Sequence, residues 1–194
     1  MKYSQNVSTF ISGTLIILYL SIGFIPNLSA VDKIAPQWFA MTILNGISIL
    51  FLVKNRSYYS VSISSILKST MSITYVGFIL WASLSYFYAI NPIEVIVNIT
   101  RQANVLLMFL VIGIFLFSFN NKINFIAWVI LIILGIEVYA VIIEAQTMII
   151  TKGSISSGEL KGVTANRNIT AFSLAIKIPF LLFLFYVTKN KFFK

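Results

Sequence analysis

The sequence predicts an all-α protein, namely a polytopic integral membrane protein with about six transmembrane helices. Hydrophobic residues make up 59% of the 194 residues and charged residues only 10%, whereas soluble domains carry about 25% charged residues. The mean hydropathy is +0.95. Several uncharged runs approach the roughly 20 apolar residues that a membrane-spanning helix needs. Together these observations favour a bundle of spanning helices over a soluble domain.

The apolar runs predict the positions of the spans. The first run could belong to a signal peptide, but Leu28-Ser29-Ala30 is a poor cleavage site and further spans follow, so we expect a retained helix. With no internal repeat or soluble domain visible, residues 1–194 are expected to form one helical domain. The expected spans are about 8–25, 37–53, 69–90, 102–119, 125–150 and 169–188.

The net charge of +9 comes from 14 Lys and Arg against 5 Asp and Glu. We interpret it as a signal of how the chain is oriented in the membrane. The cations lie mostly between the apolar runs, as in membrane proteins, so nucleic acid is not expected as a partner. The chain has no cysteine and no histidine. Disulfides and thiolate metal sites are therefore excluded, and the usual neutral-pH general base is missing. No metal and no cofactor are expected.

The distribution of these cations predicts a cytoplasmic N-terminus. With that orientation eight cations lie inside and five outside, while Lys177 falls within the sixth span. The inner set is Lys2, Lys54, Arg56, Lys68, Lys122, Lys189, Lys191 and Lys194, and the outer set is Lys33, Arg101, Lys152, Lys161 and Arg167.

Three connections between the spans have distinct patterns. Residues 54–68 are basic and serine-rich and are expected to form an inner loop with interfacial tyrosines. Asn91-Pro92-Ile93-Glu94 resembles a helix start, with Asn as cap and Pro in the first turn. The stripe of Glu94, Asn98, Arg101 and Gln102 then predicts an amphipathic outer helix that runs into the fourth span.

The third connection, 151–168, is the longest polar outer loop. Its three glycines, Gly153, Gly158 and Gly162, are the expected turn points.

Three charged residues fall inside the fifth and sixth spans. Glu137 and Lys177 lie near the centres of these consecutive spans, so they could form a buried pair that holds two helices in register. A role in substrate or proton handling is the alternative. Glu144 lies two turns from Glu137 on the same face, about 10 Å nearer the outside. It is expected to face an outer cavity without a partner, which makes it the candidate catalytic residue.

The entrance of the sixth span has the composition of a phosphate site. A helix N-terminus exposes unpaired N–H groups and partial positive charge. Asn166 and Asn168 are suitable capping residues, and Gly162 allows close approach of the backbone. Arg167 and Lys161 add full charges. Arg101 is expected at the same outer boundary, and the simpler interpretation is a set of ordinary interfacial cations.

These residues carry a resemblance to a known family. The stretch Lys161-Gly-Val-Thr-Ala-Asn-Arg-Asn-Ile-Thr-Ala171, followed by a helix with Lys177-Ile-Pro-Phe180, resembles the motif region of the O-antigen ligase and polymerase family. The early stretch Phe24-Ile25-Pro26-Asn27, with Asp32-Lys33 and Ala35-Pro36-Gln37-Trp38, is similar to the first loop of some members.

The resemblance implies a function. Family members transfer a glycan from undecaprenyl diphosphate to an acceptor hydroxyl at the outer face of the inner membrane, without metal or soluble cofactor. The implied partners are a lipid-linked oligosaccharide donor, a glycan or lipid acceptor, and membrane lipids. By position, Lys161, Arg167 and Arg101 would bind the diphosphate. Gly162, Asn166 and Asn168 would shape the loop.

The chain departs from this family in one respect. Members have more spans and a large later outer loop with a catalytic histidine, so the chain looks like the N-terminal half of such an enzyme and is expected to be inactive alone. Two alternatives stay open: a small ion- or proton-coupled secondary transporter that uses Glu137, Glu144 and Lys177, and a non-catalytic envelope assembly subunit.

Overall fold

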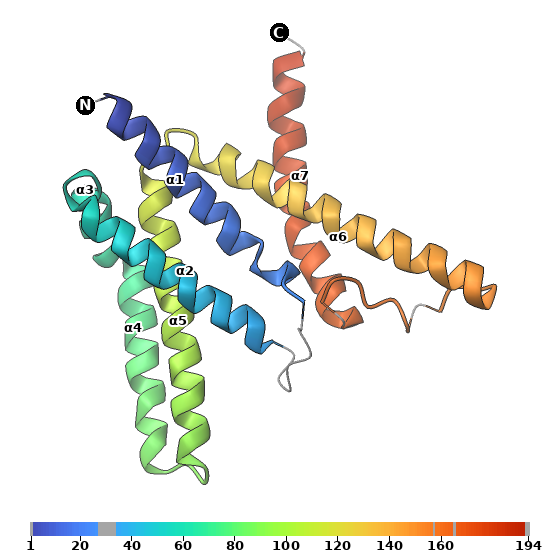
Figure 1. The fold of residues 1–194 in the computed structure, drawn as a ribbon, viewed down its shortest axis with the longest axis horizontal. Helices are drawn as coiled ribbons and strands as arrows, with labels where there is room; N and C mark the ends of the chain where they lie inside the picture. Colours follow the sequence, from blue (N-terminus) through green and yellow to red (C-terminus); the bar gives the residue numbers. More distant parts are fainter. Residues whose placement is uncertain (1, 27–33, 157, 165, 193–194) are drawn as a thin grey trace. The chain divides into compact units, whose positions relative to one another are not determined.

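The computed structural model describes residues 2–26, 34–156, 158–164 and 166–192, and within these residues all regular structure is helical (Figure 1). The predicted all-α class is therefore confirmed. The elements are α1 (Lys2–Leu20), η1 (Ile22–Phe24), α2 (Ala35–Lys54), α3 (Arg56–Leu67), α4 (Thr70–Ser83), η2 (Leu84–Phe87), α5 (Pro92–Phe117), α6 (Lys122–Lys152) and α7 (Arg167–Phe192).

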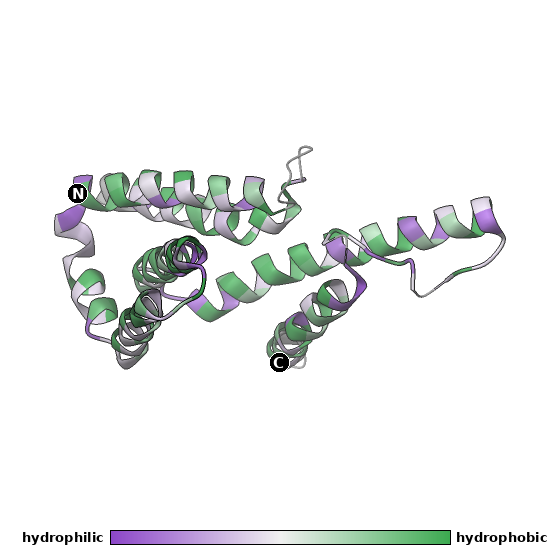
Figure 2. Cartoon of the chain, turned by 90° about the horizontal axis from the view of Figure 1, so that it is seen from below, coloured by the Kyte–Doolittle hydropathy of each residue, from purple (hydrophilic) through white to green (hydrophobic). Residues whose placement is uncertain are grey.

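Within the described residues, five helical segments are long and apolar enough to cross a membrane. A shorter apolar helix, Asn6–Leu20, lies in α1, so the expected count of about six spans is not confirmed. Figure 2 shows hydrophobic residues along most of each long helix. Many large apolar side chains on these helices are exposed, including Leu50 and Ile150. This pattern is compatible with a multi-pass membrane protein. The five segments are Ala35–Lys54, Thr70–Phe87, Pro92–Phe117, Lys122–Lys152 and Arg167–Val187.

The chain divides into two compact units, Met1–Asn120 and Asn121–Lys194, and each is described by itself. In the first unit α5 is the central helix because it contacts α1, α2, α3 and α4. Figure 1 shows α4 and α5 side by side, joined by a short connection. The second unit is the contacting pair α6 and α7. The expectation of a single domain stays a prediction.

The segment 54–68 is a helix rather than the predicted loop. α3 covers Arg56–Leu67, and the expectation that its tyrosines are all interfacial is wrong for Tyr59, which is fully buried. The ring of Tyr59 packs edge-on against Phe51 and Phe115. Its hydroxyl lies 3.0 Å from Ser8 Oγ and 2.5 Å from Ser12 Oγ on α1.

Burial raises the pKa of the Tyr59 phenol, and the hydrogen bonds with Ser12 and Ser8 partly oppose this shift. The helix forms because tertiary burial of this ring outweighs the weak helix propensity of its serines.

Replacing Tyr59 with Phe tests this packing. The variant should lower the free energy of unfolding by about 1 kcal/mol, because the buried hydroxyl links α3 to α1. Tyr58→Phe is the matched control, since the Tyr58 hydroxyl makes a longer, part-buried bond of 3.3 Å to Thr9. Unfolding by sodium dodecyl sulfate from dodecylmaltoside micelles measures both. Equal losses in the two variants would contradict the role assigned to Tyr59.

A second group of hydrogen-bonded polar side chains joins α1, α2 and α5. The Tyr19 hydroxyl donates to Asn45 Oδ1 at 2.8 Å, and Asn45 Nδ2 donates to the backbone oxygen of Asn104 at 3.0 Å. Asn104 in turn donates to Thr42 Oγ1 at 2.7 Å. Among the described residues, every buried side-chain nitrogen or oxygen has a hydrogen-bond partner. Polar side chains therefore act as contacts between helices in this unit.

The predicted start of α5 is confirmed. Asn91 is the cap, with its side chain accepting a hydrogen bond from the Glu94 N–H at 3.4 Å, and Pro92 opens the helix. The expected amphipathic segment and the fourth span form one continuous helix from Pro92 to Phe117.

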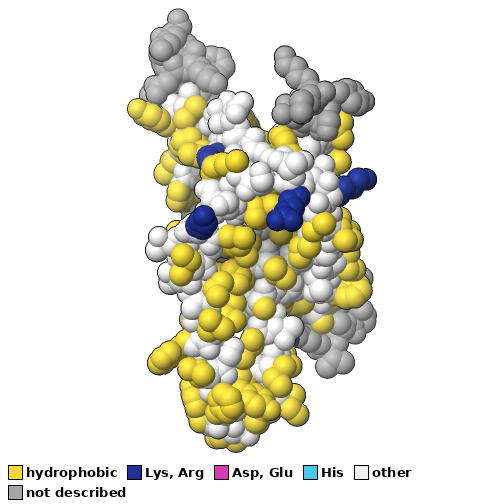
Figure 3. Space-filling view, turned by 90° about the vertical axis from the view of Figure 1, so that its left-hand side faces the viewer, with side chains coloured by type: hydrophobic (Ala, Val, Ile, Leu, Met, Phe, Trp, Pro, Cys, Tyr) yellow, Lys and Arg dark blue, Asp and Glu magenta, His cyan; other side chains and the backbone are white. Residues whose placement is uncertain are grey.

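Basic side chains flank α3. Lys54, Arg56 and Lys68 are all exposed. Figure 3 shows one face on which a few Lys and Arg side chains lie at similar height, with hydrophobic side chains above, between and below them. Cations next to apolar surface are typical of the connections of membrane proteins.

In the second unit, the three glycines predicted as turn points, Gly153, Gly158 and Gly162, all lie in bends or turns. α6 ends at Gly153, which adopts a left-handed conformation with φ 71°. The connection then leads through Gly162, with φ 57°, to the start of α7 at Arg167. Glycine is favoured at both positions because other residues rarely adopt a positive φ. α7 continues through Pro179.

Candidate anion site at the start of helix α7

The first turn of α7 is capped by Asn166. Its Oδ1 accepts hydrogen bonds from the N–H groups of Asn168 at 3.0 Å and Ile169 at 3.4 Å. The predicted cap at Asn166 is thus confirmed, whereas Asn168 lies inside the first turn and does not cap the helix. Both side chains are exposed. Arg167 is the first residue of α7, so its side chain lies at the entrance of the helix.

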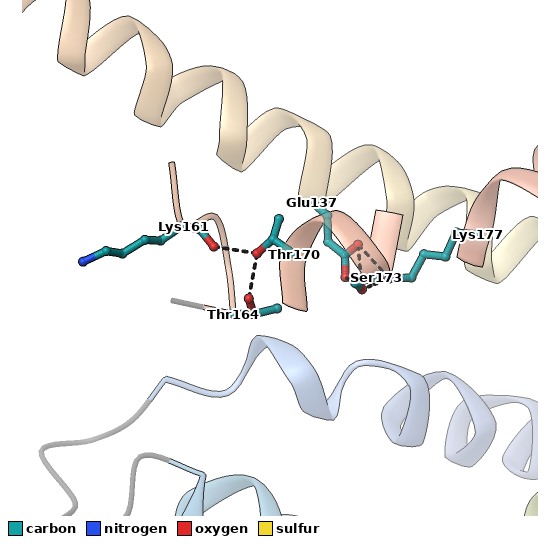
Figure 4. Close-up of polar contacts among 6 residues, drawn as sticks. All are labelled: Glu137, Lys161, Thr164, Thr170, Ser173 and Lys177. Atoms are coloured by element: carbon teal, nitrogen blue, oxygen red, sulfur yellow. Dashed lines mark hydrogen bonds and ion pairs between the residues drawn. The ribbon is translucent and has the colours of Figure 1, made fainter. Parts of the chain in front are cut away.

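Two threonines that the sequence analysis did not select hold the loop before α7. Thr170 Oγ1 donates to the backbone oxygen of Lys161 at 2.5 Å and lies 2.6 Å from Thr164 Oγ1. Figure 4 shows the Thr170 hydroxyl between these two partners, while the Lys161 ammonium points away from the cluster. Thr170 is only 8% exposed. The sequence signal for Thr170 was its place as a polar residue one turn after the Asn166 cap.

Gly162 lies close to side chains of both α6 and α7. A Cβ atom at this position would lie 2.9 Å from Thr170 Cγ2 and 3.1 Å from Val141 Cγ2. Together with the positive φ of 57°, this crowding leaves room for glycine only. The loop therefore packs closely against both α6 and α7.

Glu144 has partners, which corrects the expectation that it would have none. Its Oε2 accepts hydrogen bonds from the backbone N–H groups of Lys161 at 2.9 Å and Gly162 at 2.7 Å. The physical reason is the path of the loop, which leaves α6 at Gly153 and turns back until residues 161–162 reach Glu144. The side chain is half-buried. Its role in this structure is to hold the loop.

Glu137 and Lys177 form the ion pair considered in the sequence analysis. Lys177 Nζ lies 2.8 Å from Glu137 Oε1 and 2.7 Å from Oε2. Ser173 Oγ lies 2.5 Å from Lys177 Nζ and donates to Glu137 Oε1 at 3.2 Å. The side chains of Lys177 and Glu137 are only 16% and 12% exposed. The cluster, shown in Figure 4, joins α6 to α7 through a largely buried polar contact.

Lys161 and Arg167 are the two exposed cations of the site. The described carboxylates of this unit are engaged elsewhere: Glu159 pairs with Lys152, while Glu137 and Glu144 have the partners given above. Among the residues that the structure describes, neither Lys161 nor Arg167 forms an ion pair. The entrance of α7 therefore carries positive charge that is free to attract an anion.

Arg167 lines an open pocket of about 270 Å³. One part of the lining is polar and includes Asn168 and Thr170. The remainder is apolar and consists of Val141, Leu160, Ala171 and Leu174. A pocket with a cation beside an apolar wall suits a ligand that is itself amphipathic, with an anionic group joined to a hydrocarbon chain.

Arg101 belongs to the first unit. It is half-buried, and its guanidinium carbon lies 5.7 Å from the centre of the Trp38 ring. This is a cation–π contact. The expected place of Arg101 beside Lys161 and Arg167 stays a prediction.

Comparison of the chain with protein-family models, curated proteins and solved structures gave no match. The resemblance to the O-antigen ligase and polymerase family rests on the motif residues alone and stays a proposal. Of the second resembling stretch, Asn27, Asp32 and Lys33 lie outside the described residues. Within the described part of the chain, no group of three or more His, Cys, Asp or Glu side chains could hold a metal ion.

Proposed function

We propose that the chain binds a lipid-linked diphosphate at the entrance of α7, on the outer face of a bacterial inner membrane. One observation carries this proposal: the pocket beside Arg167 combines an exposed cation, which has no ion-pair partner among the described residues, with an apolar wall. Part of that wall lies on α6 and α7, which are both long enough to span a membrane. A soluble anion would need the cation alone, whereas a polyprenyl diphosphate needs both surfaces.

The diphosphate would bind to charges and backbone dipoles together. Arg167 can bind phosphate oxygens through two parallel hydrogen bonds, and Lys161 adds a mobile point charge. The N-terminus of α7 contributes its partial positive charge. The apolar residues of the pocket, Val141, Leu160 and Leu174 among them, would contact the first isoprene units of the lipid.

The reaction that fits this site is glycan transfer of the kind the O-antigen ligase and polymerase family performs. The lipid-linked oligosaccharide is the donor, and a glycan or lipid hydroxyl is the acceptor. Cations on the leaving diphosphate stabilise the negative charge that develops there. Glu144 is the candidate base, because the sequence contains no histidine and this carboxylate lies beside the loop that carries Lys161.

The orientation follows from the positive-inside rule. The exposed cations around α3, namely Lys54, Arg56 and Lys68, favour a cytoplasmic position for that helix and for the N-terminus. With α3 inside and with α4, α5 and α6 each crossing the membrane, the start of α7 would lie on the outer side, where the glycan acceptor would be.

Binding to a defined lipid tests the proposal. The purified full chain in dodecylmaltoside is titrated with farnesyl diphosphate and, separately, with farnesol, by isothermal calorimetry. Saturable binding of the diphosphate, with much weaker binding of the alcohol, is the expected result. Equal binding of the two compounds would show that the headgroup is not recognised and would contradict the proposal.

A further inference from the structure

Two consecutive backbone N–H groups converge on one oxygen atom in the loop before α7. The N–H groups of Lys161 and Gly162 both donate to Glu144 Oε2, at 2.9 and 2.7 Å. Gly162 has a φ of 57°. Successive N–H groups that point to one side, with a left-handed residue in the pair, form a concave anion site of the type called a nest. This nest holds a carboxylate in the present structure.

The carboxylate in the nest comes from α6 and not from the loop. Glu144 is half-buried, and the loop is fixed independently from the other side, where Thr170 binds the carbonyl of Lys161 and Gly162 packs against α7. The nest therefore has a second support besides Glu144. Its shape does not depend on the carboxylate alone, so another anion can take its place.

The chemistry of the nest matches a phosphate group. A phosphate oxygen accepts hydrogen bonds from backbone N–H groups in the same way as a carboxylate oxygen, and it carries more negative charge. Lys161 provides both a nest N–H group and an exposed ammonium. A diphosphate near the nest would be repelled by Glu144 as long as the carboxylate stays in place.

We propose that Glu144 is an internal substitute for the ligand: it occupies the Lys161–Gly162 nest in the empty protein, and a phosphate oxygen of the lipid-linked diphosphate displaces it. This inference rests on the proposed function and adds a step to it. Displacement frees the Glu144 carboxylate only when the donor is bound. Donor binding and release of this carboxylate are thereby coupled.

Affinity for farnesyl diphosphate in two variants tests the displacement. Glu144→Ala removes the competing group, and Glu144→Gln keeps an oxygen that can accept the nest hydrogen bonds but removes the charge. Both should bind farnesyl diphosphate about tenfold more tightly than the wild type. Glu159→Gln is the matched control. It also removes one carboxylate charge, but from the loop that follows α6. The Glu159 carboxylate pairs with Lys152 and not with the nest, so the affinity of this variant for farnesyl diphosphate should change less than twofold.

The outcomes separate the two proposals. Tighter binding by both Glu144 variants, each as a monodisperse protein in size-exclusion chromatography, supports displacement. Unchanged or weaker binding in Glu144→Gln, with clear binding in the wild type, overturns displacement and leaves the proposed function in place. An equal gain in Glu159→Gln also overturns it, because the effect would then be one of overall charge. If neither the wild type nor any variant binds the diphosphate, the proposed function fails and this inference with it.

Discussion

Lys177→Met is expected to lower the free energy of unfolding by about 3–5 kcal/mol, which is the cost of breaking a buried ion pair from one side. The variant removes the cationic partner of Glu137, whose side chain is only 12% exposed in the wild type. Ser173 is then its remaining hydrogen-bond donor among the contacts described. The loss should be read from unfolding by sodium dodecyl sulfate in mixed micelles, with the helicity followed by circular dichroism.

Two controls show whether the loss comes from the unpaired charge. The double variant Glu137→Met/Lys177→Met removes both charges and should recover most of the lost stability, since similar apolar residues often replace a buried pair without loss. Lys152→Met breaks the exposed pair with Glu159 and should cost about 1 kcal/mol or less. If Lys177→Met were no more harmful than Lys152→Met, the Glu137–Lys177 pair would not hold α6 to α7.

The second large effect is expected on binding. Arg167→Ala should weaken the affinity for farnesyl diphosphate by roughly 10- to 100-fold, because it removes charge-assisted hydrogen bonds to the phosphate oxygens. Arg167→Lys should recover part of the affinity, since a lysine keeps the charge without the planar pair of donors. Isothermal calorimetry on the full chain measures all three dissociation constants.

Arg56→Ala serves as the matched control for this binding experiment. Arg56 is also an exposed arginine in the first turn of a helix, but it begins α3 in the first unit. Its loss should leave diphosphate affinity within twofold of the wild type. Comparable weakening by Arg56→Ala and Arg167→Ala would mean that the protein attracts the lipid through its overall positive charge, and no specific site would remain.

Local patterns were enough to predict the long helices and some of their ends. Long apolar runs require helices in a membrane, because backbone groups must be satisfied within the segment. The Asn91-Pro92 start of α5 and the Asn166 cap of α7 depend on adjacent residues only. Gly153 and Gly162 were recognisable as turns for the same reason.

The features that sequence reasoning missed all depend on distant partners. Residues 54–68 have the polar composition of a loop, but Tyr59 is buried because Ser8 and Ser12 lie opposite it on α1. The pairing of Glu144 depends on the return path of the loop after Gly153, and spacing along the chain does not encode that path. The hydrogen bond from Thr170 to the carbonyl of Lys161 depends on the same return path of the loop.

The side of the membrane on which α7 begins is the most direct test of the account. The chain contains no cysteine, so Asn168→Cys provides a single label site in the exposed first turn of α7. A membrane-impermeant maleimide should label it in intact spheroplasts, more slowly when farnesyl diphosphate is present. Ser57→Cys, at an exposed position on α3, should react only after permeabilisation. Labelling of Asn168→Cys only after permeabilisation would contradict an outward-facing donor site.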